Sequence, residues 1–266
     1  MATRHTHIEK IGARIRRLVI EMSHRSRSGE TGSALSISDI LAVLYFKIMR
    51  NDPKKPDDPK RDRFVLSKGH GAAALYAALA LRGYFEEDLL HGHRMNGGVF
   101  HGHPSRGAAP GIEVSTGSLG HGLSIAVGMA YALRKTKSTV YVLLGDGECN
   151  EGSVWEAVLS AGALALPNII AIVDDNKFQG FGASREINPF DMERQWQSFG
   201  WSAERVDGHD VDALERALRA ATHSQRPTVI IADTVSGKGV PAIENSLQAH
   251  YYVPDDAALE AAGNNL

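Results

Sequence analysis

Apolar residues recur along the start of the chain at the spacing of an amphipathic helix. Ile8, Ile11, Ile15, Leu18 and Met22 follow this spacing, so one face of a helix over this segment is expected to be buried. The same criterion predicts further helices over residues 38–49, 69–81, 119–135, 153–165 and 210–222.

Three apolar runs rich in β-branched residues have a different pattern, because they lack regular polar positions. They cover residues 139–144, 168–173 and 228–235. Such runs are typical of strands buried on both faces of a parallel sheet. Helical segments lie between them, which indicates βαβ units with right-handed crossovers. We therefore expect an α/β fold over residues 1–266, with one parallel sheet, helices on both of its faces, and a single domain.

Composition narrows the classes of function. The 266 residues are 43% hydrophobic and 23% charged, and the formal net charge is -2. This balance favours neither nucleic acid nor an anionic membrane as a partner, and Arg14, Arg16 and Arg17 are expected on a solvated helix face.

The one cysteine, Cys149, excludes an intrachain disulfide framework. There is neither a signal-peptide core nor an apolar run of the roughly 20 residues that a membrane helix needs, so a cytoplasmic location is expected.

Polar residues follow two of the expected strands at the points where the strands end. Gly-Asp-Gly occupies positions 145–147, and Asp-Asp-Asn occupies positions 174–176, one crossover helix later. Ligands of open parallel sheets bind at the carboxyl ends of strands, so Asp146 and Asn176 are expected side by side. A carboxylate and an amide oxygen form part of the hard oxygen shell that Mg²⁺ completes with phosphates and water. Gly-Asp-Gly alone is commonly only a turn, but the pairing across one βαβ unit favours a diphosphate held through Mg²⁺.

This pair of motifs resembles the thiamine diphosphate motif, with Asp175 in place of its first asparagine, as is frequent in transketolases. Other segments resemble the cofactor-binding domain of transketolase, in the family's order, from about Ile8 to about His250. They are Ser28-Gly29, Ser38-Asp39-Ile40, the run from Asp62 to Gly71, Gly102-His103-Pro104, the run from Thr116 to Gly120, the run from Asp207 to Asp210, and Gly237-Lys238-Gly239.

The resemblance implies a thiamine-diphosphate-binding fold and a role for particular residues. The metal ligands, for Mg²⁺ or Ca²⁺, would be Asp146, Asn176 and the backbone carbonyl of Phe178. The cofactor would contact Gly117, Ser118, Leu119, Gly145, Asp146, Gly147 and Asn176. The catalytic residues would be His70, His103 and His250 at the reaction centre, with Glu151 linking two active sites across a dimer. Imidazoles suit this place, because they can stabilise a developing oxyanion and move protons of sugar hydroxyls.

Transketolase itself is substantially longer, and the glutamate that activates the cofactor's aminopyrimidine lies in a later domain. The resemblance therefore implies the N-terminal subunit of a split transketolase, which would be active only with a C-terminal subunit, in a heterotetramer. Its reaction would be the transfer of a two-carbon ketol unit from a ketose sugar to an acceptor.

Three positions depart from the family pattern. Glu30 replaces a histidine, Ser118 replaces a proline, and Tyr251 replaces a glycine. Glu30 is expected in the substrate channel with His103 and His250, where it could change specificity. Alternatively, it turns away and pairs with an arginine such as Arg27.

Other interpretations remain open at this point. The histidines His91, His93, His101 and His103 could form a zinc site, although no carboxylate or thiol ligands accompany them. Cys149 is expected to be a small buried residue and not a nucleophile. The acceptor could instead be a thiol or a carrier protein, as in 2-oxo acid dehydrogenase complexes. A non-catalytic cofactor-binding role is a further alternative, against which the presence of Asp146, Asn176 and His70 argues.

Overall fold

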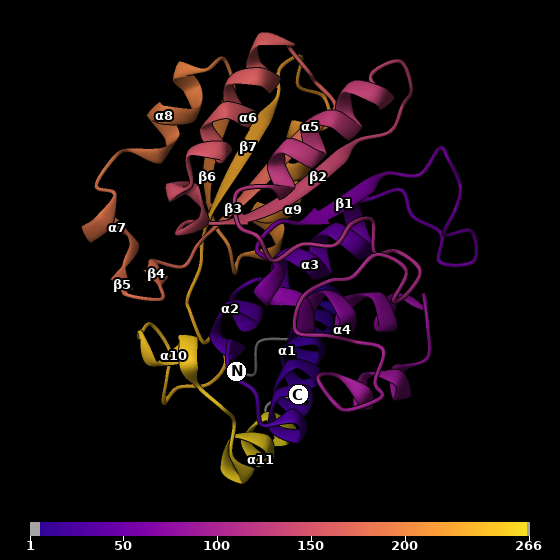
Figure 1. The fold of residues 1–266 in the computed structure, drawn as a ribbon, viewed down its shortest axis with the longest axis vertical. Coiled ribbons are helices and arrows are strands. Elements are labelled where there is room, and N and C mark those ends of the chain that lie inside the picture. Colours follow the sequence, from indigo (N-terminus) through magenta and orange to yellow (C-terminus); the bar gives the residue numbers. More distant parts are fainter. Residues whose placement is uncertain (1–5, 265–266) are drawn as a thin grey trace.

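A five-stranded parallel sheet lies between two layers of helices (Figure 1). The computed structural model describes residues 6–264. The strands are β1 (Arg63–Leu66), β2 (Val140–Gly145), β3 (Ile169–Asp175), β6 (Ser202–Asp207) and β7 (Thr228–Asp233). They lie in the order β1-β2-β3-β7-β6, and every neighbouring pair is parallel. The predicted α/β class and parallel sheet are confirmed.

The two faces of the sheet pack into two separate cores. Tyr141 and Ile170 enter one core, while their neighbours Val142 and Ile169 enter the other, as the alternation of side chains along a strand requires. The first core is completed by α1 (His7–Ser26), α3 (Ser38–Val43), α4 (Ala72–Arg82) and α9 (Val211–Ala221). The second is completed by α5 (Gly122–Leu133), α6 (Gly152–Ala163) and α8 (Met192–Ser198). Helices therefore cover both faces, as predicted.

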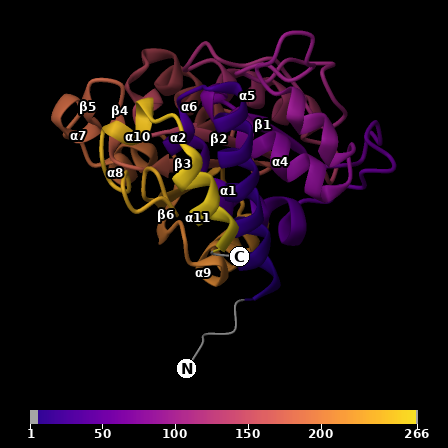
Figure 2. The ribbon, with the colours of Figure 1, turned by 90° about the horizontal axis from the view of Figure 1, so that it is seen from below.

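Shorter elements connect these layers. They are α2 (Thr31–Ser36), the π-helical η1 (Leu44–Ile48), the 3₁₀ turns η2 (Gly69–Gly71), η3 (Glu87–Gly92) and η4 (Glu148–Asn150), the hairpin of β4 (Phe178–Gln179) and β5 (Gly182–Ala183), α7 (Ser184–Ile187), α10 (Gln248–Tyr251) and α11 (Asp256–Asn264). Figure 2 shows α11 alongside α1. Among the described residues, every helix is too short or too polar to cross a membrane.

The sequence did not predict β1 or β6. The apolar part of β1 is only three residues long, and β6 is an edge strand whose residues are partly or fully exposed. The arginine cluster is also less solvated than expected. Arg16 donates to a carboxylate oxygen of Asp39 at 2.8 Å, and Asp39 is buried.

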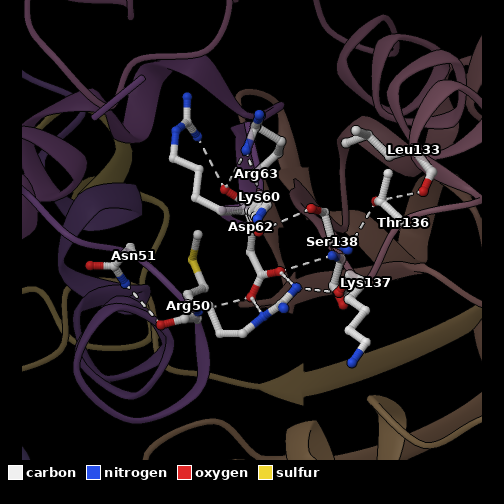
Figure 3. A network of polar contacts seen from close by, with 12 residues as sticks. Arg50, Asn51, Lys60, Asp62, Arg63, Leu133, Thr136, Lys137 and Ser138 are labelled. Atoms are coloured by element: carbon white, nitrogen blue, oxygen red, sulfur yellow. Dashed lines mark hydrogen bonds and ion pairs between the residues drawn. The ribbon is translucent and has the colours of Figure 1, made fainter. Parts of the chain in front are cut away.

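Asp62 joins the beginnings of β1 and β2 (Figure 3). Its carboxylate is 3% exposed and accepts hydrogen bonds from the Arg50 guanidinium at 2.7 Å and the Thr139 backbone N–H at 2.9 Å. Ser138 adds a hydrogen bond from its hydroxyl to the Lys60 carbonyl at 3.2 Å. These contacts fix two strands whose opposite ends carry the candidate site.

Candidate active site

A cavity of about 400 Å³ lies at the carboxyl ends of the central strands. Of the residues proposed from sequence for the site, those that line it are Glu30, His70, His103, Gly117, Leu119, Gly145, Asp146, Gly147, Glu151, Asn176, Phe178 and His250. Ser118 does not line it, and its hydroxyl lies 3.3 Å from Nδ1 of His121. The cavity thus brings together segments that are far apart in the sequence.

Asp146 and Asn176 emerge from the neighbouring strands β2 and β3, which are paired so that Gly145 lies opposite Asp174. Both side chains are buried. The Asn176 amide nitrogen donates to Asp174 at 2.9 Å, which leaves its oxygen to accept the Phe178 N–H at 3.0 Å. This arrangement leaves a carboxylate and an amide oxygen in the same cavity, and both are of the type that Mg²⁺ prefers as ligands.

The Asp146 carboxylate has no cationic side-chain partner among the described residues. Its hydrogen-bond donors are the backbone N–H groups of Gly147 and Lys177 and the hydroxyl of Ser184. Burial raises its pKa to about 7, and this effect is only partly opposed by the Ser184 hydrogen bond. A buried carboxylate with this deficit of positive charge, beside an amide oxygen, fits a divalent cation.

The four histidines considered for zinc do not converge. Among residues 6–264, no group of three or more His, Cys, Asp or Glu side chains is arranged to hold a metal ion. His93 is instead buried against Tyr76, with ring centroids 5.8 Å apart. A magnesium shell built from one carboxylate, one amide oxygen and one carbonyl does not depend on such a group.

Asp174 is the centre of a buried network beneath the cavity. Ser36, Lys68 and Asn176 donate to its Oδ2, and Thr234 donates to its Oδ1. The donors come from α2 and from the segments after β1, β3 and β7. One carboxylate therefore fixes four segments around the site, a role that sequence analysis assigned neither to Asp174 nor to Lys68.

Glu148 was also missed, although it connects two of the loops that line the cavity. Its carboxylate accepts the backbone N–H groups of Gly120 at 2.9 Å and Gly145 at 3.2 Å, and the hydroxyl of Ser67 at 2.5 Å. Its side chain is buried. Glu148 thus holds the loop at 117–120 against the loop that carries Asp146.

The three proposed histidines lie around the same cavity. The rings of His70 and His250 are 6.2 Å apart, and His103 packs against the backbone of Gly117, whose φ of 138° favours glycine. Burial holds the pKa of His70 well below its usual value, and nearby Lys68 adds to this effect. His70 is therefore a neutral imidazole near neutral pH.

Of the positions that depart from the family pattern, Glu30 lines the cavity. Glu30 pairs with an arginine, as the alternative expected, but the partner is Arg94 and not Arg27, and Glu30 still lines the cavity. Tyr251 donates its phenolic hydrogen to the carbonyl of Gly180 at 2.6 Å.

Fold and site together define an α/β protein with a cavity at the carboxyl ends of its parallel strands, where a buried carboxylate and an amide oxygen fit a divalent cation. The family model described as the thiamine diphosphate binding domain of transketolase matches residues 8–263. The chain belongs to this family, is a transketolase-like transferase, and has thiamine diphosphate as its cofactor.

Relatives of similar length support this assignment. A 6-deoxy-6-sulfo-D-fructose transketolase subunit of Clostridium sp. is 44% identical, over 89% of this chain and 87% of that protein. An apulose-4-phosphate transketolase subunit of Actinobacillus succinogenes is 40% identical, over 96% of this chain and 94% of that protein. The solved transketolase of Leishmania mexicana superimposes with a TM-score of 0.92 at 31% identity, covering 98% of this chain and 41% of that chain. The chain thus spans about two fifths of the longer transketolase.

Proposed function

We propose that this chain is the thiamine-diphosphate-binding subunit of a two-chain transketolase, which transfers a two-carbon ketol unit from a ketose donor to an acceptor. One observation carries the proposal: a single cavity gathers the Asp146–Asn176 pair and the three histidines His70, His103 and His250. The relatives favour this reaction over transfer to a carrier thiol, because they are described as transketolases.

The cavity offers a place for each part of the cofactor. Asp146, Asn176 and the Phe178 carbonyl would hold a divalent cation, and through it the diphosphate, while Gly145 and Gly147 let the backbone approach. Gly117 and Leu119 would contact the aminopyrimidine, and Ser118 would shape the same loop from outside the cavity. When bound, thiamine diphosphate supplies the chemistry that breaks the carbon–carbon bond beside a ketose carbonyl.

The histidines would bind the sugar and move its protons. A neutral imidazole donates one hydrogen bond and accepts another, so it can pass a proton to or from a hydroxyl. The lowered pKa of His70 keeps it in this form. His103 and His250 come from two further segments that line the same cavity, where they could contact other hydroxyls.

We propose that residues 1–266 form one domain and that a separate C-terminal subunit supplies the rest of the active site. Two observations support this. The chain covers only 41% of a solved transketolase, yet it covers most of relatives that are described as subunits. Glu151 lies at the exposed edge of the cavity, where it could meet the partner in a heterotetramer.

The test compares the isolated chain with the reconstituted complex. With thiamine diphosphate, Mg²⁺ and a ketose, the chain alone should be inactive and the complex with a C-terminal transketolase subunit should turn over. His70→Ala should lower kcat in the complex by about 100-fold, the scale of a lost proton-transfer group. His91→Ala is the matched control, because His91 is exposed outside the cavity. Efficient turnover by the isolated chain would contradict the two-chain proposal.

A further inference from the structure

Glu30 places a carboxylate at the rim of the cavity, beside two of its histidines. The residue has a left-handed backbone with φ of 65°, and its N–H donates to the carbonyl of His250 at 3.0 Å. Non-glycine residues adopt this conformation only where the surroundings hold them in it. The backbone therefore aims Glu30 towards the cavity, which it lines together with His70 and His250.

Arg94 holds this carboxylate from the other side. Its guanidinium contacts Glu30, and the two side chains are 25% and 32% exposed. The guanidinium also lies on the backbone of Gly102, where an added Cβ would come within 2.7 Å of Nε. The buried Nε has no hydrogen-bond partner among the described residues. Arg94 is thus confined to one place, and Glu30 is its described ionic partner.

Tyr251 does not itself line the cavity, but it joins two segments that do, those of His250 and Gly180. Figures 1 and 2 place α10 beside the hairpin of β4 and β5, and the hydrogen bond from Tyr251 to Gly180 joins them. The backbone of Tyr251 also lies against Gly29, where an added Cβ would be 3.2 Å from the Tyr251 carbonyl oxygen. The segment that presents Glu30 is therefore packed against the segment that presents His250.

Four other charged side chains line the cavity, namely Lys68, Asp146, Glu148 and Glu151, and Glu151 lies at its exposed edge. Lys68 is paired with Asp174, Glu148 accepts three hydrogen bonds, and Asp146 belongs to the cation site. The carboxylate of Glu30 can accept hydrogen bonds from hydroxyl groups, but it repels another anion brought close to it. Arg94 reduces this repulsion without removing it.

We propose that Glu30 and Arg94 are specificity-determining residues with opposite effects: Glu30 favours a neutral, hydroxyl-rich donor over a donor whose carbonyl carries a neighbouring carboxylate, and Arg94 weakens this preference. This inference rests on the proposed ketol transfer, because it concerns the choice of donor for that reaction. Glu30 disfavours the anionic donor, and Arg94 limits how strongly it does so.

Because Glu30 and Arg94 carry opposite charges, their replacement should change the donor preference in opposite directions. The probes are erythrulose, a neutral ketose, and hydroxypyruvate, which carries a carboxylate beside its carbonyl. In the reconstituted complex, Glu30→Gln should raise the ratio of kcat/KM for hydroxypyruvate to that for erythrulose by about three- to tenfold, because a repelling charge is removed. Arg94→Gln should lower the same ratio, because Glu30 loses its neutralising partner. The double variant should fall between the two.

The dependence on ionic strength and a control variant at another arginine distinguish an effect of charge from structural damage. The change caused by Glu30→Gln should shrink as ionic strength rises, since salt screens partly exposed charges. Arg27→Gln should leave the ratio unchanged, because Arg27 does not line the cavity. An unchanged ratio in Glu30→Gln, or shifts of the same sign in both single variants, would overturn the inference. Failure of the wild-type complex to turn over either donor would instead count against the proposed function.

Discussion

The ammonium group of Lys68 lies 2.5 Å from Oδ2 of Asp174, and the two side chains are 1% and 0% exposed. Two charges this deeply buried are tolerated only when they satisfy each other and the remaining hydrogen-bonding capacity is also used. Ser36, Asn176 and Thr234 fill that capacity at Asp174. The ion pair therefore belongs to the construction of the site, because the same carboxylate orients Asn176.

Removing one member of this pair should be costly. We expect Lys68→Met or Asp174→Ala to lower the free energy of unfolding by about 3 kcal/mol, the scale for stranding one buried charge. The combination of Lys68→Met with Asp174→Asn should recover part of the loss, because neither charge remains. Urea denaturation of the chain measures this. The partly exposed pair of Lys47 and Glu215, 4.0 Å apart, is the control, and Lys47→Met should change stability by less than about 0.5 kcal/mol.

Replacing Asp146 by asparagine should change the stability of the protein in opposite directions with and without the cofactor. Without a cation, Asp146→Asn removes a buried charge that lacks a cationic partner, so the chain should unfold at slightly higher urea concentration. With Mg²⁺ and thiamine diphosphate, the variant should lose most of the stabilisation that the ligands give to the complex, because a charged metal ligand is missing. Calorimetric titration of the complex measures the affinity directly. Asp88→Asn, at an exposed position, should bind normally, and normal binding by Asp146→Asn would mean that the Gly-Asp-Gly segment is only a turn.

The sequence predicted the central strands and most long helices because their apolar patterns are strong. Runs 139–144, 168–173 and 228–235 correspond to β2, β3 and β7, which are buried almost throughout. β6 escaped prediction because an edge strand needs no continuous apolar run, and its pairing with β7 comes from distant sequence. Tertiary pairing, and not local propensity, determines such a strand.

The residues of the site, too, could be predicted only in part. Asp146 and Asn176 could be proposed from spacing, because each follows a strand and parallel strands place their carboxyl ends together. The Glu30–Arg94 pair could not, since the two residues lie 64 positions apart and meet only through two irregular segments. Lys68, Glu148 and Asp174 lie within the motif segments or next to them, but nothing local indicates that their charged groups are buried and shared.

Glu148 offers a test of how the two cavity loops depend on each other. Glu148→Ala should strand the N–H groups of Gly120 and Gly145 and release the loop at 117–120, which we propose contacts the cofactor. We expect the affinity of the complex for thiamine diphosphate to fall by about tenfold, the scale seen when a residue that orients ligands is lost. Glu148→Gln retains the acceptor oxygen and should lose less. Glu156→Ala, on the exposed side of α6, should bind the cofactor normally, and equal affinity in Glu148→Ala would show that the loop is held by other contacts.

His93 should make the stability of the protein depend on pH. Its ring is buried, neither ring nitrogen has a hydrogen-bond partner among the described residues, and burial, with a smaller effect from Arg94, lowers its pKa from 6.5 to about 4. In the unfolded chain the His93 imidazole therefore binds a proton near pH 6.5, whereas in the folded chain it binds one only near pH 4. Above pH 6.5 the titration of His93 does not affect the free energy of unfolding. As the pH drops from 6.5 to 4, this free energy falls, by up to about 3 kcal/mol at pH 4.

Comparison of wild type with His93→Phe isolates this effect. Phenylalanine preserves the aromatic contact with Tyr76 but cannot bind a proton, so the variant should lose less stability between pH 7 and pH 4.5. Urea denaturation at a series of pH values gives the difference curve, which should slope below pH 6.5 and be flat above it. His223→Phe is the control, because His223 is exposed, and it should retain the pH dependence of the wild type. If the His93→Phe curve runs parallel to that of the wild type, His93 becomes protonated in the folded protein as readily as in the unfolded chain.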